Sequence, residues 1–328
     1  MNSGHKKFMT DLQVKGYATY DKLKTCIVGR GYNKEQFNDI KNQKVKDVLF
    51  KILDETEEDY QNLCGVLQTA GVETLRPDIV QGDITHRPAN QPRDDMAVIG
   101  EMLYVNNNRP EYKSILDRIE NKVIVEDCVE KKLISTSFIH RLGDSLHWGT
   151  NKPGWRDSEL VRKYQEQWTS EGFNVDIMEQ EGHGDCTWCV PKPGCIVTLF
   201  EIQDYKEKFP GWEVCYLEDK YWDQLSPFRK VKRRNGGKWW VPGEENSDDF
   251  SNYVETYLRD WVGYVEETVF EVNMLSLDQN TILVNNYNKK VFDFLEKNKV
   301  TPVIAPFRHR WFWDGGVHCI TQDLYREH

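Results

Sequence analysis

Hydrophobic positions along the chain follow two periods in turn, one typical of strands and one typical of helices. Short apolar runs over residues 24–30 and 194–200 predict buried strands. Apolar residues at helical spacing predict helices over residues 46–71 and 157–172, and each of these helices ends at a glycine. Each predicted helix leads into a further strand-like run. Strands and helices therefore alternate along the chain, which is typical of an α/β fold.

The order strand, strand, helix, strand recurs several times without an obvious linker. One example is a hairpin predicted over residues 268–286, which is followed by a helix over 289–299. The residue identities show no repeat, so only the order of elements recurs. Residues 204–266 are less regular and rich in tryptophan and tyrosine, and we interpret them as an insertion. The sequence thus predicts an N-terminal extension over residues 1–19 and a single α/β domain over residues 20–328.

Composition and charge narrow the class of partner. The chain has 43 Lys and Arg against 53 Asp and Glu, a net charge of −10, so it lacks the positive footprint that nucleic-acid binding needs. No window approaches eighteen apolar residues, which argues against a membrane partner, and no apolar signal segment is visible at the N-terminus. Eight cysteines are too few for a disulfide scaffold. We expect a cytoplasmic location with reduced thiols, and a small-molecule partner.

The first candidate for chemistry is the segment HGDCTWCVPKPGC, which contains His183, Cys186, Cys189 and Cys195. A Cys-x-x-Cys pair beside a histidine is a signal for zinc or redox chemistry. However, a structural zinc site usually needs a second ligand pair, which is absent, and the following prolines exclude the helix of a thioredoxin-type motif. We favour buried small side chains on a strand and expect no metal.

The second candidate is Cys319, in the C-terminal sequence WDGGVHCIT. A cysteine nucleophile needs a base within reach, and histidine is the usual base. On a strand, His318 would point to the opposite face, so we expect the base to come from elsewhere. His183 is the attractive choice, because Asp185 would share its face of a strand. A lone cysteine would favour an inert core thiol, so this interpretation depends on the combination.

The third candidate is the sequence QPRDDMAVIG, in which Arg93, Asp94 and Asp95 precede an apolar strand. Three charged residues at a strand entry are usually a solvated turn. The functional alternative is a carboxylate that holds a cationic group, such as a guanidinium, by two parallel hydrogen bonds.

Taken in order, these segments resemble the amidinotransferase family, which includes glycine and inosamine-phosphate amidinotransferases and belongs to the guanidino-modifying superfamily. The resemblance extends from about residue 20 to residue 326, outside the insertion. It rests on the segments Tyr20–Arg30, Leu67–Pro77, Gln91–Tyr104, His183–Val197, Phe270–Asn286 and Asp314–Arg326.

The resemblance implies a five-bladed α/β propeller (pentein) of ββαβ modules with pseudo-fivefold symmetry and a central active site. It implies that Cys319 is the nucleophile, that His183 is the general acid and base, and that Asp94 and Asp185 bind the substrate guanidinium. The implied reaction moves an amidino group from a guanidino donor, expected to be arginine, to an acceptor amine through an amidino-cysteine, without a cofactor. A homodimer is kept open as the state of assembly.

The same resemblance marks further candidate residues around the site. The glycines at 315 and 316 are expected to let the backbone pass close to a small planar substrate. The histidine at 318 is a candidate site residue but not the base. The full set of these additional candidates is Arg93, Asp144, Asn273, Gly315, Gly316 and His318.

Two positions depart from the family pattern. The family carries an aspartate that partners the catalytic histidine, whereas Ile134, Ser135 and Ser137 stand near that place here. The family's glycine-specific enzymes also carry an arginine for the donor's carboxylate, and Ile202 stands near that place. Three alternatives stay open: an amidinotransferase, a hydrolase of a guanidine or amidine, and a non-catalytic binding protein on the same scaffold.

Overall fold

The computed structural model describes residues 11–80, 84, 86–180, 182–202, 204–217, 239–262 and 270–328, and its strands form five three-stranded sheets. The strands are β1 (Lys22–Val28), β2 (Glu73–Leu75), β3 (Met96–Ile99), β4 (Met102–Val105), β5 (Lys122–Ile124), β6 (Ile139–Leu142), β7 (Ser145–Thr150), β8 (Asn174–Glu179), β9 (Trp188–Lys192), β10 (Cys195–Thr198), β11 (Glu213–Tyr216), β12 (Leu275–Asp278), β13 (Thr281–Val284), β14 (Thr301–Ile304) and β15 (Thr321–Glu327). The α-helices are α1 (Gln43–Thr69), α2 (Pro92–Asp95), α3 (Lys113–Leu116), α4 (Glu159–Ser170), α5 (Tyr205–Lys208), α8 (Asp248–Tyr257), α9 (Lys289–Lys297) and α10 (Arg310–Trp313).

Each sheet is built by the same rule. The first two strands are antiparallel and the second and third are parallel, with a helix in the connection between the parallel pair. The sheets are β15–β1–β2, β3–β4–β5, β6–β7–β8, β9–β10–β11 and β12–β13–β14. In the first sheet the leading strand is β15, so the C-terminus completes the module that the N-terminus begins. The predicted ββαβ repeat and α/β class are thus confirmed.

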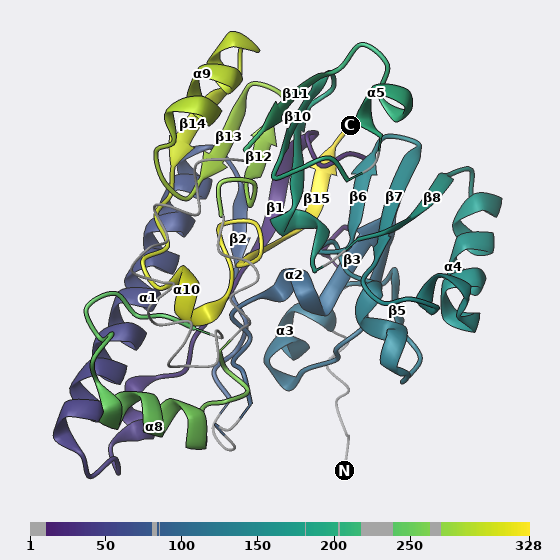
Figure 1. Ribbon diagram of the computed structural model, residues 1–328. Helices are drawn as coiled ribbons and strands as arrows, with labels where there is room; N and C mark the ends of the chain where they lie inside the picture. Colours follow the sequence, from purple (N-terminus) through teal and green to yellow (C-terminus); the bar gives the residue numbers. More distant parts are fainter. Residues whose placement is uncertain are drawn as a thin grey trace, which may run out of the picture.

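The helices form where the sequence supplies a cap and an apolar face. The Asn42 side chain accepts hydrogen bonds from the backbone N–H groups of Lys44 (3.1 Å) and Val45 (3.4 Å) at the start of α1. The chain leaves α1 through Gly71, whose φ of +79° suits glycine. Figure 1 shows α1 and α9 along one side of the molecule and α4 along the other, outside the sheets. The first two strands of each sheet are mostly buried, whereas the third strands, β2, β5, β8, β11 and β14, are half-buried or exposed at most positions.

The segment interpreted as an insertion is joined to this frame. Its first part forms α5 and β11, and β11 pairs with β10, so the fourth module extends into residues 204–266. Its helix α8 packs into the same hydrophobic cluster as α1. Residues 203, 218–238 and 263–269 lie outside the described residues. The described part of the N-terminal extension is held against the domain, because its residues 15, 16 and 18 form isolated β-bridges to residues 325, 100 and 142.

A buried ion cluster connects four of the five modules. Asp323 of β15 accepts from Arg93 of α2 (2.5 Å), from Arg141 of β6 and from Arg326 of its own strand (2.7 Å). The Arg141 guanidinium also donates to a carbonyl of β3, and that of Arg326 to a carbonyl of β12. Burial would raise the pKa of Asp323, but the three guanidinium groups hold it well below its ordinary value.

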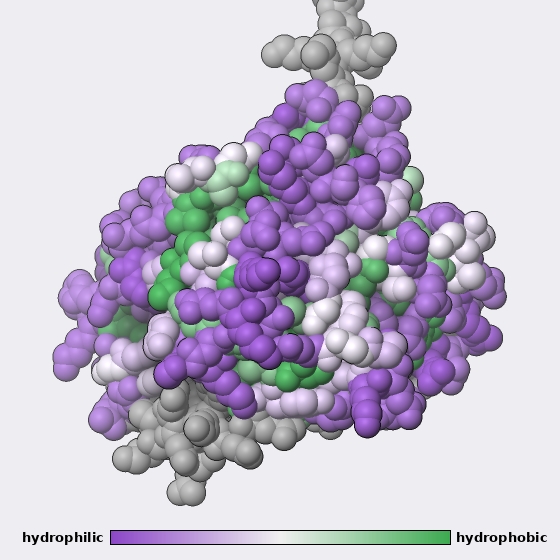
Figure 2. All heavy atoms as spheres, turned by 90° about the horizontal axis from the view of Figure 1, so that it is seen from above, coloured by the Kyte–Doolittle hydropathy of each residue, from purple (hydrophilic) through white to green (hydrophobic). Residues whose placement is uncertain are grey.

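The surface gives no sign of a membrane-spanning element. Among the described residues, the helices are either too short or too polar to cross a bilayer. Hydrophilic residues cover most of the face seen in Figure 2, and apolar residues occupy narrower areas between them. The homodimer stays a prediction.

Candidate active site

The site is assembled from the short segments that precede the first strand of each module. Asp94 precedes β3, Ser137 precedes β6, Asp185 precedes β9, Asn273 precedes β12 and Cys319 precedes β15. A chain of contacts links them: the N–H of Asp185 donates to the carbonyl of Ser137 (3.2 Å), and the Ser137 side chain hydrogen-bonds Asp94. The repeat therefore brings together residues that lie far apart in sequence.

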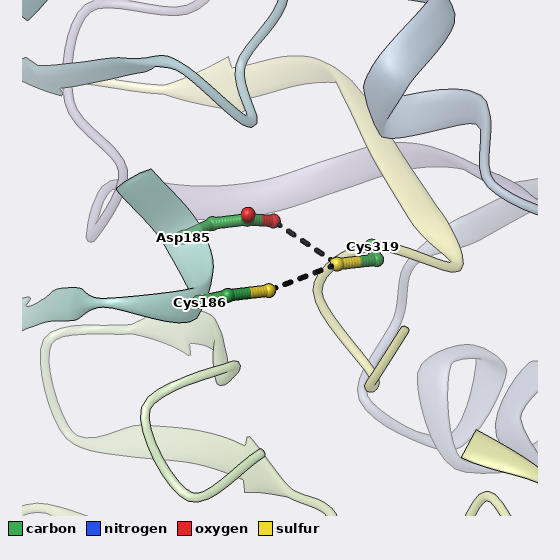
Figure 3. Close-up of side chains that lie close together, drawn as sticks. All are labelled: Asp185, Cys186 and Cys319. Carbon is green, nitrogen blue, oxygen red and sulfur yellow. Dashed lines mark hydrogen bonds between the residues drawn. The ribbon is translucent and has the colours of Figure 1, made fainter. Parts of the chain in front are cut away.

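Cys319 lies at the centre of these contacts and is 1% exposed. Its Sγ accepts a hydrogen bond from Nδ2 of Asn273 (2.9 Å) and donates to Oδ2 of Asp185 (3.3 Å). A second thiol, that of Cys186, lies 3.8 Å from the same sulfur (Figure 3). An amide donor at the sulfur stabilises the thiolate form over the thiol. These surroundings suit a nucleophile better than an inert core thiol.

The strand geometry expected for these residues is wrong. Cys319 lies in a turn two residues before β15, and Asp185 lies in a 3₁₀ turn, Gly184–Cys186, before β9. Alternation of faces along a strand therefore does not decide which side chains meet. In this structure both His318 and Cys319 reach the carboxylate of Asp185, although they are adjacent in sequence.

His318 and Asp185 form a buried pair. Nδ1 of His318 lies 2.7 Å from Oδ2 of Asp185, and because a carboxylate only accepts, the ring donates. Burial lowers the pKa of His318 to about 4, and the nearby charge of Arg93 adds to this, so the ring is neutral at pH 7. Burial would raise the pKa of Asp185, but the hydrogen bond from His318 and the nearby charges of His183 and Arg93 together outweigh burial, and the pKa is lowered. Asp185 is thus a carboxylate at neutral pH.

His183 faces the other candidate carboxylate. Its Nδ1 lies 3.6 Å from Oδ1 of Asp94, and its ring packs edge-on against Phe138 at 4.7 Å between centroids. Both His183 and Asp94 are about one quarter exposed, with side-chain exposures of 29% and 24%. Burial raises the pKa of Asp94, and the charge of His183 opposes that rise. The expected pairing of His183 with Asp185 on one strand face is therefore replaced by a pairing across modules.

Two asparagines hold the turn that carries the nucleophile. Oδ1 of Asn273 accepts from the backbone N–H groups of His318 (2.9 Å) and Cys319 (3.2 Å). Oδ1 of Asn285 accepts from the N–H of Val317 (2.8 Å), and its Nδ2 donates to the carbonyl of Asn273 (2.9 Å). The resemblance had marked Asn273, whereas Asn285 was missed because it lies in an apolar hairpin without a motif.

The paired glycines lie tightly against side chains of neighbouring segments. A Cβ on Gly315 would overlap the side-chain amide of Gln91, and one on Gly316 would lie 2.6 Å from Oδ1 of Asn273 and 2.7 Å from Nδ2 of Asn285. They let the backbone approach the protein's own side chains, and the expected close approach to a substrate stays a prediction. Gln91 in turn donates from Nε2 to two carbonyls of the same turn, each at 2.8 Å.

Two further candidates are placed outside the central contacts. Arg93 is fully buried in the ion cluster and donates from Nε to the carbonyl of His318 (3.1 Å), so it supports the turn rather than facing a substrate. Asp144 lies exposed in the turn between β6 and β7, away from the buried residues. Its carbonyl accepts from the N–H of Asn174 (2.7 Å), and its role in the site stays a prediction.

The cysteines of the HGDCTWC segment separate as well. Cys189 and Cys195 are buried on β9 and β10, as expected for small side chains on strands. Cys186 instead joins Asp185 and Cys319 in a group whose potential ligand atoms all lie within 4.8 Å of one another. The sequence had linked Cys186 to Cys189 by their spacing, so its neighbour across 133 residues was missed.

Comparisons with known proteins identify the fold. No family model and no curated protein sequence matches the chain. Among solved structures, the inosamine-phosphate amidinotransferase of Streptomyces griseus is 16% identical with a TM-score of 0.64, and covers 96% of this chain and 97% of its own. SxtG, an amidinotransferase of saxitoxin biosynthesis from Microseira wollei, is 15% identical with a TM-score of 0.61, covering 96% and 98%.

Hydrolases share the same architecture. The dimethylarginine dimethylaminohydrolase of Pseudomonas aeruginosa is 11% identical with a TM-score of 0.55, and covers 92% of this chain and 98% of its own. At such identities the likeness establishes the fold and leaves the reaction open. The chain has the pentein fold that these enzymes share, and its five three-stranded sheets agree with the five α/β modules that the sequence motifs imply.

Proposed function

We propose that this chain is a guanidino-modifying enzyme that transfers an amidino group from a guanidino donor to an amine. The observation that carries the proposal is the convergence of one thiol, two carboxylates and one imidazole from three modules: Cys319, Asp185, Asp94 and His183. The fold shared with amidinotransferases supports the same function. Arginine is the donor that we expect.

The two carboxylates suit a planar cation. Asp185 is ionised at neutral pH, and Asp94 lies near enough to it that the charge of Asp185 adds to the raised pKa of Asp94. A guanidinium between them would satisfy both, because its N–H groups fan out in one plane. Oδ1 of Asp185 has no hydrogen-bond partner among the described residues and offers one such acceptor. Binding would therefore orient the guanidinium carbon toward Cys319.

The reaction then has two balanced half-reactions. In the first, the Cys319 thiolate forms an S–C bond to the guanidinium carbon, and the C–N bond to the donor breaks as His183 protonates the leaving amine. In the second, the acceptor amine attacks the amidino carbon and gives its proton to His183, and the S–C bond breaks to restore the thiolate. The Asn273 amide stabilises the sulfur's charge at the start and the end of this cycle.

Asp94 supplies the acid that the sequence lacks beside His183. The residues near the family's aspartate position, Ile134, Ser135 and Ser137, are all buried, and the two serine hydroxyls bond each other at 2.6 Å. A carboxylate 3.6 Å from Nδ1 of His183 can hold the orientation of the ring. Asp94 would thus serve the base as well as the substrate.

The products of one assay separate the alternatives. Arginine labelled at the guanidino carbon is incubated with and without a panel of primary amines. Amine-dependent ornithine with a labelled amidino product supports transfer. Ornithine with labelled urea would mean that water takes the amidino group, and citrulline with ammonia would mean that the other C–N bond breaks. Either hydrolytic result would refute transfer.

A covalent intermediate gives an independent test. After an acid quench, mass spectrometry is expected to find one added amidino group on Cys319 in the wild-type protein and in a Cys189→Ser control. Cys319→Ala is expected to bind arginine without turnover. If the wild-type protein binds arginine but forms neither adduct nor product, the chain is a binding protein and the proposed enzyme function is wrong.

A further inference from the structure

Cys186 has no part in the proposed reaction, although it lies at the nucleophile. Its side chain is buried, and its Sγ lies 3.8 Å from that of Cys319 and 3.3 Å from Nδ2 of Asn273. Figure 3 shows the side chains of Asp185 and Cys186 extending from the same turn toward Cys319. One amide thus donates to both sulfur atoms, which holds the two thiols in one orientation.

Two of the three donor separations are close to those of a tetrahedral zinc site, and all three donor atoms lie within 4.8 Å of one another. With Zn–S near 2.3 Å and Zn–O near 2.1 Å, tetrahedral angles place two sulfur ligands about 3.8 Å apart and a sulfur and an oxygen about 3.6 Å apart. The observed separations are 3.8 Å between the two sulfurs and 3.3 Å between Sγ of Cys319 and Oδ2 of Asp185. These two separations differ from the tetrahedral values by at most a few tenths of an ångström, and the Asp185 and Cys186 side chains would complete the site by adjusting within the 4.8 Å that spans all three donor atoms. A disulfide would instead need the sulfurs to close to about 2.05 Å.

We propose that Asp185, Cys186 and Cys319 form a binding site for zinc or a similar thiophilic divalent cation. Two thiol protons leave as the dication binds, so the net charge of the buried cluster does not change. Three protein ligands leave the fourth tetrahedral position for water or an amine. Soft thiolate ligands select such a cation over magnesium or calcium.

Occupancy of this site would switch off the chemistry described above. A metal-bound Cys319 has its lone pair engaged and cannot attack a guanidinium carbon, and Asp185 is removed from guanidinium binding at the same time. Zinc would then compete with the guanidino substrate, and a chelator would restore activity. This inhibitory consequence rests on the proposed function, whereas the binding site itself does not.

Direct binding tests the site without any assay of turnover. Zinc is titrated calorimetrically into the full chain with thiols kept reduced, and one equivalent is expected to bind. Cys186→Ser is expected to weaken that affinity about 100-fold or more. The matched control is Cys189→Ser, which removes a buried thiol from the same segment but not from the cluster, and it should bind as the wild type does. Equal affinity in Cys186→Ser would overturn the proposal.

If Cys186→Ser fails to fold, its weak zinc binding would say nothing about the site. Two measurements on the wild-type protein therefore test the site without a variant. Cobalt in place of zinc should give the intense thiolate-to-metal absorption and the visible bands of a tetrahedral site, and absence of the thiolate band would refute the ligand set. Zinc should also protect Cys186 and Cys319 from alkylation while leaving the half-buried Cys64 and Cys128 unchanged. Alkylation of Cys186 at an undiminished rate in saturating zinc would also refute the proposal. Both measurements report zinc binding directly, so their outcome does not depend on whether the protein turns over a substrate.

Discussion

Replacing Asp323 by asparagine keeps the shape of the side chain but removes the charge shared by three buried guanidinium groups. The Asp323 side chain is 0% exposed, and those of its partners Arg93, Arg141 and Arg326 are at most 2% exposed. Without the carboxylate, three cations would stay buried in mutual repulsion, and one amide N–H group would face a guanidinium. Breaking a buried ion pair by removing one partner costs about 3–5 kcal/mol.

The expected loss is therefore about 4 kcal/mol, against a total stability of about 5–15 kcal/mol for a folded protein. For a chain of 328 residues the unfolding entropy is about 0.7 kcal/mol/K, so the melting temperature should fall by about 6 °C. Calorimetry and urea unfolding measure the two quantities. The control is Asp117→Asn, which breaks an i,i+4 pair with the exposed Lys113 and should change stability by less than about 0.5 kcal/mol.

The lowered pKa of Asp323 also predicts how the stability difference between wild type and Asp323→Asn depends on pH. Burial alone would raise the pKa of Asp323, but Arg141, Arg93 and Arg326 hold it well below the ordinary value, so the folded state resists protonation. The contribution is therefore fully present above about pH 4 and is lost as the pH falls below that. Wild type and Asp323→Asn should differ by a constant amount from about pH 5 to 8. A difference below about 1 kcal/mol at pH 7 would refute the view that the cluster stabilises the junction of modules.

Gly315→Ala should lower kcat at least about 10-fold and destabilise the fold by about 1–3 kcal/mol, because the new Cβ overlaps Gln91 beneath the nucleophile's turn; unchanged steady-state kinetics would contradict this. Gly65→Ala, inside α1 with open space around it, should instead stabilise the protein by about 0.5–1 kcal/mol in urea unfolding. Asp176→Asn should cost about 1 kcal/mol at pH 7, because the hydrogen bond from His147, together with the nearby Lys208 ammonium, lowers the pKa of this partly exposed carboxyl to about 2. This cost should shrink as the pH falls below about 4 and disappear only below the folded-state pKa of about 2. A pH-independent cost would show that this charge is not the cause.

The repeat of elements could be predicted from the sequence because apolar periodicity and glycine stops act locally. The prediction missed β6 and β7 as strands, since they carry Arg141 and two histidines that the buried ion cluster and aromatic contacts accommodate. It also assigned β11 to an insertion, because a four-residue strand after a four-residue helix is too short for either period to show. Such elements depend on neighbours supplied by the rest of the fold.

The site could be predicted as a set of residues but not as a set of pairs. The motifs named Cys319, His183, Asp94, Asp185 and Asn273, and the structure places all five in the segments before the first strands of their modules. Which acid faces which base is decided by turns between modules, and no spacing in the sequence encodes it. For the same reason a motif match could name Asp144, although it lies exposed in the turn between β6 and β7.

The arrangement of the two carboxylates bears on the choice between transfer and hydrolysis. Asp185 accepts a hydrogen bond from His318 and is buried, as is Cys319. Asp94 and His183, in contrast, are each about one quarter exposed. A covalent amidino group on Cys319 would therefore be sheltered on the sulfur side and reachable from the side of His183. The imidazole of His183 lies beside Asp94, where the proposed reaction needs a group that takes the proton of the attacking amine. An amine can also replace the departed amine beside Asp94, and the proposal of transfer rests on that replacement.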